Sequence, residues 1–84
     1  MSAYELALQT RRRANLRHLI QALEREGIQS WALQAGILGD ISGPELQAIM
    51  ADGTITDAFA REVEWAMQRP SGWLDRQPED ALDN

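Results

Sequence analysis

Residues that end helices divide this chain into segments of helical length. Gly27, Gly36 and Gly53 each follow apolar residues at helical spacing, and Pro70 pushes the residue before it out of the helical region. The clearest apolar stripe consists of Leu16, Leu19, Ile20 and Leu23. No segment alternates apolar and polar residues as a strand would. We therefore predict an all-α fold, a compact domain of four to five helices.

The predicted helices have recognisable starting points. The first spans about residues 3–26. Each later helix follows a residue whose hydroxyl can accept a hydrogen bond from the first turn: Ser30, Ser42 and Thr56. The second helix is expected to end or loosen at Gly36, which leaves residues 37–40 as a linker from which Ile37 and Leu38 reach into the core. The sequence PSGWLD at residues 70–75 then predicts a turn or a very short fifth helix, with Trp73 and Leu74 held against the core.

The chain has the size of one small domain, and its charge is unevenly distributed. Residues 1–30 carry five Arg against three Glu, for +2, whereas residues 31–84 carry three Arg against ten acidic residues, for −7, which together give the net charge of −5. This balance argues against a general nucleic-acid binder, which is normally basic. We predict a domain over residues 1–75 and an acidic, disordered tail over residues 76–84.

Composition also argues against several classes of protein. The chain has no Cys and one His, so disulfides, thiolate metal sites and a zinc site are not expected, and neither is a cofactor. It has no apolar run of 18 residues and no signal-peptide pattern, which predicts a cytoplasmic protein without membrane contact. We find no convincing set of catalytic residues and therefore do not expect an enzyme.

The third predicted helix has the most complete set of boundary signals. Ser42 and Glu45 have the spacing of a capping box, and Pro44 lies in the first turn, where a missing N–H costs nothing. The inward side is predicted to consist of Leu46, Ile49 and Met50. The residues left on or near the outer face are Ser42, Gly43, Glu45, Gln47, Ala48 and Ala51.

Parts of the sequence resemble the lambda-repressor-like (Cro/CI-type) DNA-binding domains of phage and prophage regulators. The relevant segments are DG at residues 52–53, Ile55, AREVEWA at residues 60–66, and the closing PSGWLD. The sequence RRANLRHLIQALEREG at residues 12–27 is similar to the first helix of that family. The resemblance covers roughly residues 10–76. It implies a helix-turn-helix domain that acts as a sequence-specific transcriptional regulator, binding double-stranded DNA as a homodimer.

The same resemblance implies roles for particular residues. Those expected to read bases are Ser42, Gly43, Glu45, Gln47 and Ala48, and those expected to bind phosphates are Arg11, Arg12, Arg13 and Arg17. Taken alone, the arginines favour a solvated helix face over phosphate contacts, because charge runs are usually solvated, and the capping box already accounts for Glu45. The sequence also departs from the family, because its third helix has no Arg or Lys and residues 36–43 are longer than the usual turn of about four residues.

These departures keep a second hypothesis open. The chain is then a helix-turn-helix protein that no longer binds DNA and acts as a protein-interaction module, such as an antirepressor-like or accessory factor. Trp65 lies one residue away from the apolar stripe of the fourth predicted helix. A half-exposed tryptophan is a reasonable interface residue, because Trp is enriched at binding hot spots.

Overall fold

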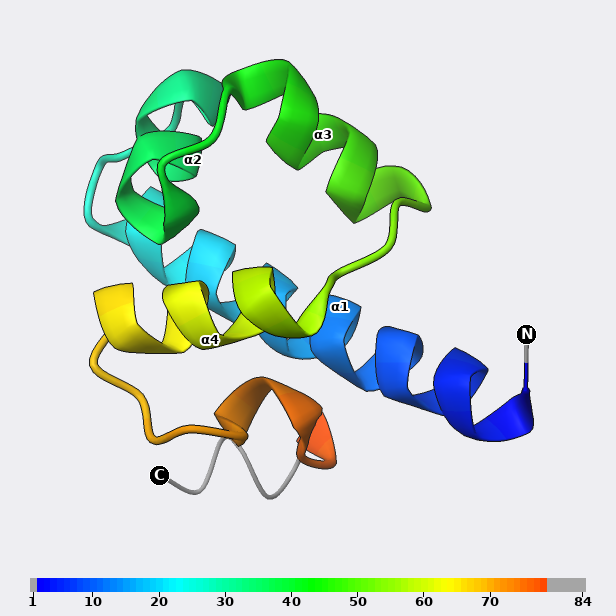
Figure 1. Ribbon diagram of the computed structural model, residues 1–84. Helices are drawn as coiled ribbons and strands as arrows, with labels where there is room; N and C mark the ends of the chain where they lie inside the picture. The colour runs from blue at the N-terminus through cyan, green and yellow to red at the C-terminus, as the bar shows by residue number, and fades with distance from the viewer. Residues whose placement is uncertain (1, 79–84) are drawn as a thin grey trace.

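The computed structural model describes residues 2–78 and is all-helical (Figure 1). These residues form four α-helices, α1 (Ala3–Arg25), α2 (Trp31–Gly39), α3 (Gly43–Ala51) and α4 (Asp57–Ala66), followed by a 3-10 helix, η1 (Trp73–Asp75). The predicted all-α fold class is therefore confirmed. Most of the predicted tail, residues 79–84, lies outside the described residues.

A hydroxyl group caps the start of every one of the four α-helices. The side chains of Ser2, Ser30, Ser42 and Thr56 each accept a hydrogen bond from the backbone N–H three residues later. At α3 the Glu45 carboxylate also accepts from the Ser42 N–H, which completes the predicted capping box. The predicted starts of α2, α3 and α4 are confirmed, because a capping hydroxyl is a local signal that tertiary packing does not need to supply.

The predicted end of α2 is wrong. The helix continues through Gly36 to Gly39, and Asp40 ends it in the left-handed conformation with a φ of 56°. A glycine inside a helix costs only about 1 kcal/mol. Burial of Leu38 in the core outweighs that cost. The predicted linker is thus mostly helix, and α2 and α3 are joined by only three residues, 40–42.

The core forms where the shorter helices meet the middle of α1. Its fully or nearly fully buried apolar residues are Leu16, Leu19, Ile20, Leu23, Ala35, Leu38, Leu46, Ile55, Ala60, Val63, Trp73 and Leu74. Helix α2 packs against both α3 and α4, while η1 packs against α1 and α4. In Figure 1 the N-terminal turns of α1 extend beyond the other helices. Residues 3–7 are accordingly exposed.

Two buried polar side chains hold the C-terminal segment against the core. The Asn15 amide donates to the carbonyl oxygens of Leu74 at 2.9 Å and Arg76 at 3.0 Å. The Glu64 carboxylate accepts from the backbone N–H groups of Gly72 at 3.0 Å and Leu74 at 2.8 Å. The very short fifth helix and the burial of Trp73 and Leu74 are therefore as predicted. The hydrogen bonds of Asn15 and Glu64 explain why so short an element keeps its position.

Candidate functional site

Helix α3 presents to solvent a narrow surface that carries no positive charge. Four of the five residues predicted to read bases are exposed: Ser42, Glu45, Gln47 and Ala48. Leu46 is completely buried and fixes which side of the helix faces outward. The exposed residues within the helix are Pro44, Glu45, Gln47, Ala48 and Ala51. Only Gln47 among these has a side chain that can donate and accept hydrogen bonds.

Gly43 does not lie on the outer face as predicted. It is buried, and a Cβ atom placed on it would lie 3.1 Å from the backbone nitrogen of Ala32 and 3.3 Å from the carbonyl carbon of Trp31. The N-terminal ends of α2 and α3 therefore lie side by side. Their backbone N–H groups give this region partial positive charge, because the positive end of a helix dipole is at its N-terminus.

Ser42 and Glu45 are committed to the structure of α3. The backbone N–H of Ser42 donates to the Glu45 carboxylate at 3.1 Å, and the Ser42 hydroxyl accepts from the Glu45 N–H at 3.2 Å. The hydrogen bond from the Ser42 backbone lowers the pKa of the Glu45 carboxyl, which keeps it negatively charged. By contrast, the Gln47 amide forms no hydrogen bond within residues 2–78, so its donor and acceptor groups are available to a ligand.

Arg12 does not lie on an exposed face as predicted; its side chain is only 3% exposed. Its guanidinium donates to the Ile55 carbonyl, to Asp57 Oδ1 and to Asp75 Oδ1, each at 2.7 Å. The hydrogen bond with Asp75 raises the pKa of Arg12, although burial opposes this. A side chain with these partners is not available to a phosphate group, so Arg12 is a structural residue.

Arg11 and Arg13 are also partly engaged within the chain, whereas Arg17 is not. Arg11 Nε donates to the Asp75 carbonyl at 2.9 Å. Arg13 donates to the carbonyl oxygens of Ile49 at 3.2 Å and of Gly53, at the C-terminal end of α3. Arg17 is exposed and forms no hydrogen bond or ion pair within residues 2–78. Among the four predicted phosphate-binding residues, Arg17 alone is fully available in the described structure.

The charges around Arg12 form one continuous network. Asp75 also pairs with Arg61 at 3.0 Å, and Arg61 pairs with the buried carboxylate of Glu64 at 2.9 Å. Asp57, Arg12, Asp75, Arg61 and Glu64 are therefore linked across α1, α4 and η1. The pairing of Arg12 with Asp57 and Asp75 was not predicted, because these residues are 45 and 63 positions away from it along the chain.

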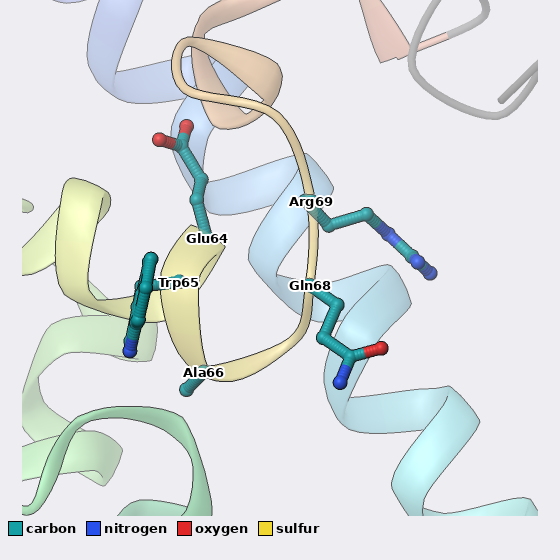
Figure 2. Close-up of a pocket in the computed structure, with 5 residues that line it drawn as sticks. All are labelled: Glu64, Trp65, Ala66, Gln68 and Arg69. Atoms are coloured by element: carbon teal, nitrogen blue, oxygen red, sulfur yellow. The ribbon is translucent and has the colours of Figure 1, made fainter.

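Trp65 is more exposed than predicted, at 87% of its surface. It lies two residues from the fully buried Val63, which places the two side chains on opposite sides of α4. A hollow of about 500 Å³ at the end of α4 is lined by Glu64, Trp65, Ala66, Gln68 and Arg69. In Figure 2 the side chains of Trp65 and Arg69 extend in different directions. This hollow therefore has no converging polar groups of the kind found in small-molecule sites.

The outer side of α2 was not identified as a surface from the sequence. Leu33 and Ile37 are 61% and 39% exposed, although Ile37 was predicted to reach the core. The available signal was the composition of the helix, because α2 contains no charged residue at all. An apolar helix side exposed to water is a recognised mark of an interaction surface.

Neither a metal site nor a membrane span is found in the described part of the chain. Within residues 2–78, no three His, Cys, Asp or Glu side chains gather as metal ligands do. None of the helices over the same residues is both long enough and apolar enough to cross a membrane.

Comparisons of the whole chain with protein-family models, curated protein sequences and solved structures gave no match.

Proposed function

We propose that this protein is a sequence-specific DNA-binding transcriptional regulator, with α2 and α3 as its helix-turn-helix. The observation that carries the proposal is that two short helices, α2 and α3, are joined by only three residues. One side of α3 is exposed to solvent. Helix-turn-helix pairs are joined by about three to four residues. The major groove is about 12 Å wide and admits one α-helix. Small residues on α3 allow its backbone to approach the base edges closely.

In this proposal Gln47 is the main base-reading residue. A glutamine amide pairs well with N6 and N7 of adenine. Ser42 and Glu45 contribute less, because each is held by the other. The adjoining N-terminal ends of α2 and α3 supply backbone N–H groups that suit a phosphate. Two copies on a two-fold-related site would double the contacted sequence, as in other helix-turn-helix regulators.

The small number of available arginines predicts that the affinity for DNA depends only weakly on salt concentration. Of the four predicted phosphate-binding arginines, Arg17 alone has no partner within residues 2–78, while Arg11 and Arg13 are half-buried and partly engaged. Each neutralised phosphate contributes about −0.9 to the slope of log K against log salt concentration. With one to three arginines used, we expect a slope of roughly −1 to −3 for each protomer.

The test is binding to DNA from around the protein's own coding region, measured by fluorescence anisotropy at two salt concentrations. Gln47→Ala should lose the preference for specific over scrambled DNA, because it removes the amide that reads the base. Gln21→Ala, an exposed glutamine on α1, is the matched control. An unchanged preference in Gln47→Ala would refute the base-reading role. No binding by the folded protein at low salt would refute the regulator.

A second candidate is a protein-interaction module, and two observations favour it. Trp65 is almost fully exposed, and three of the four candidate phosphate-binding arginines contact the protein itself. Such a module needs no affinity for polyanions. Retention on heparin at low salt separates the candidates, because the regulator should be retained and an Arg17→Ala variant should elute earlier.

A further inference from the structure

The solvent-facing side of α2 is entirely apolar. Its exposed residues are Trp31, Ala32, Leu33, Gly36 and Ile37. A quarter of the residues in the whole chain are charged, yet α2 has none. Helix α2 lies at the edge of the fold in Figure 1.

This side of α2 has a ridge beside a groove. Leu33 and Ile37 are four residues apart and therefore lie one above the other on the helix surface. Ala32 and Gly36 have the same spacing and form the neighbouring row, which is low because both residues are small. A Cβ atom placed on Gly36 would meet nothing within 4 Å, so the groove is open at Gly36, while its other end at Ala32 lies beside Gly43 of α3.

We propose that the outer side of α2 binds the same side of α2 in a second copy of this chain. In a two-fold contact, the Leu33–Ile37 ridge of each copy enters the Ala32–Gly36 groove of the other. Rows of residues four apart pack in this way in the commonest class of helix pairs. A surface that carries both its ridge and the matching groove is self-complementary, as a two-fold interface requires.

Charge also favours a second copy as the occupant. The chain has a net charge of −5, so most contacts between two copies bring like charges together. The side of α2 avoids this cost because it contains no charge. A strongly charged partner would find no complementary group there.

The size of the surface sets the expected strength of the dimer. A nine-residue helix is about 13 Å long. A contact centred on two such helices is smaller than the ~1,600 Å² of a standard stable interface. We therefore expect a dissociation constant on the order of 10–100 µM, in the range of weak interfaces.

The experiment is sedimentation equilibrium of the full chain without DNA, from about 5 µM to 1 mM, a range chosen to bracket the expected constant. The average mass should rise from 9.4 kDa towards twice that value. Leu33→Glu should weaken the dimer at least tenfold, because it puts like charges in the contact. Leu6→Glu, the same substitution at an exposed leucine of α1, should leave it unchanged.

Gly36→Ala is a second variant, and its effect on the dimer cannot be attributed to unfolding. The added methyl group fills the groove and should also weaken the dimer, while circular dichroism shows an equal or more stable helix. A wild-type chain that stays monomeric at 1 mM would overturn the proposal. An equal effect of Leu33→Glu and Leu6→Glu would overturn it too. Because DNA is absent, either result leaves the regulator hypothesis to its own test.

Discussion

Arg12 connects three segments that are distant in sequence. Its guanidinium donates hydrogen bonds to the Ile55 carbonyl, to Asp57 in the first turn of α4, and to Asp75 in η1. Removing one member of a buried ion pair typically costs about 3–5 kcal/mol. Asp57 is 87% exposed, so water can compensate for part of this loss.

We therefore expect Arg12→Leu to lower the free energy of unfolding by about 3 kcal/mol. Urea denaturation measures this change directly. Arg17→Leu removes the same positive charge from the same helix and should change stability by less than about 0.5 kcal/mol. Similar losses in the two variants would contradict the structural role of Arg12.

Asp75 makes stability depend on pH. Burial raises the pKa of its carboxyl, but hydrogen bonds from Arg12 and Arg61 outweigh burial and hold the pKa below 3.8. A carboxyl with a lowered pKa in the folded state stabilises the fold above its unfolded pKa. That contribution is lost as the pH falls through the folded value.

Thermal melts between pH 7 and pH 2 should show this effect. The wild-type melting temperature should fall as the pH drops below about 4. Asp75→Asn should melt at a lower temperature at pH 7 and lose less on acidification. Glu24→Gln, an exposed carboxyl on α1, should follow the wild type. An Asp75→Asn profile parallel to the wild type would show that Asp75 is not responsible.

The roles of the arginines could not be predicted from the sequence. Consecutive residues of a helix point about 100° apart, so Arg11, Arg12 and Arg13 necessarily face different surroundings. Which surroundings they meet is decided by Ile55, Asp75 and the end of α3, all at least 36 residues away. A charge run is thus a weak guide to a phosphate-binding surface.

At the level of the helices, starting points were predicted better than end points. The caps at Ser30, Ser42 and Thr56 were read correctly because each depends on one side chain and one nearby N–H. The end of α2 was misplaced because Gly36 is tolerated when the next turn buries Leu38. The burial of Gly43 was missed for a related reason, since it depends on the crossing of α2 and α3.

Two glycines in these helices should respond to alanine in opposite directions. Gly36→Ala should raise the free energy of unfolding by about 0.5–1 kcal/mol at low protein concentration, because alanine favours helix and the position is open. Gly43→Ala should lower it by about 1–3 kcal/mol, because its methyl group would press on the backbone of α2. Denaturant titrations of both variants test this pair, and a stabilising Gly43→Ala would show that α2 and α3 can separate freely.

At the scale of the whole molecule, the C-terminal segment completes the core. Trp73 and Leu74 are buried against α1 and α4, and Asn15 and Glu64 form hydrogen bonds with the backbone around them. The closing sequence PSGWLD predicted a short element here. The two buried polar partners were not predicted, because a polar residue in a helix is ordinarily expected to face water.

Removing the C-terminal segment should show that it is needed to complete the core. A chain of residues 1–71 lacks two core residues. It also removes the carbonyl partners of Asn15, the backbone N–H partners of Glu64 and the Asp75 partner of Arg12, so it should lose cooperative thermal unfolding. A chain of residues 1–78 keeps all of these contacts and should melt within a few degrees of the full protein. Differential scanning calorimetry distinguishes the two outcomes. Cooperative unfolding of the 1–71 chain would mean that the helices α1 to α4 form a sufficient core.

The outer side of α3 has a consequence for evolution. Gln47, Ala48 and Ala51 are exposed, while the residues that hold α3 in place lie at its ends or on its buried side. Substitutions at these three positions can therefore accumulate at little cost to folding. In the proposed regulator, such substitutions would exchange one base preference for another through single changes, each of which leaves a folded intermediate.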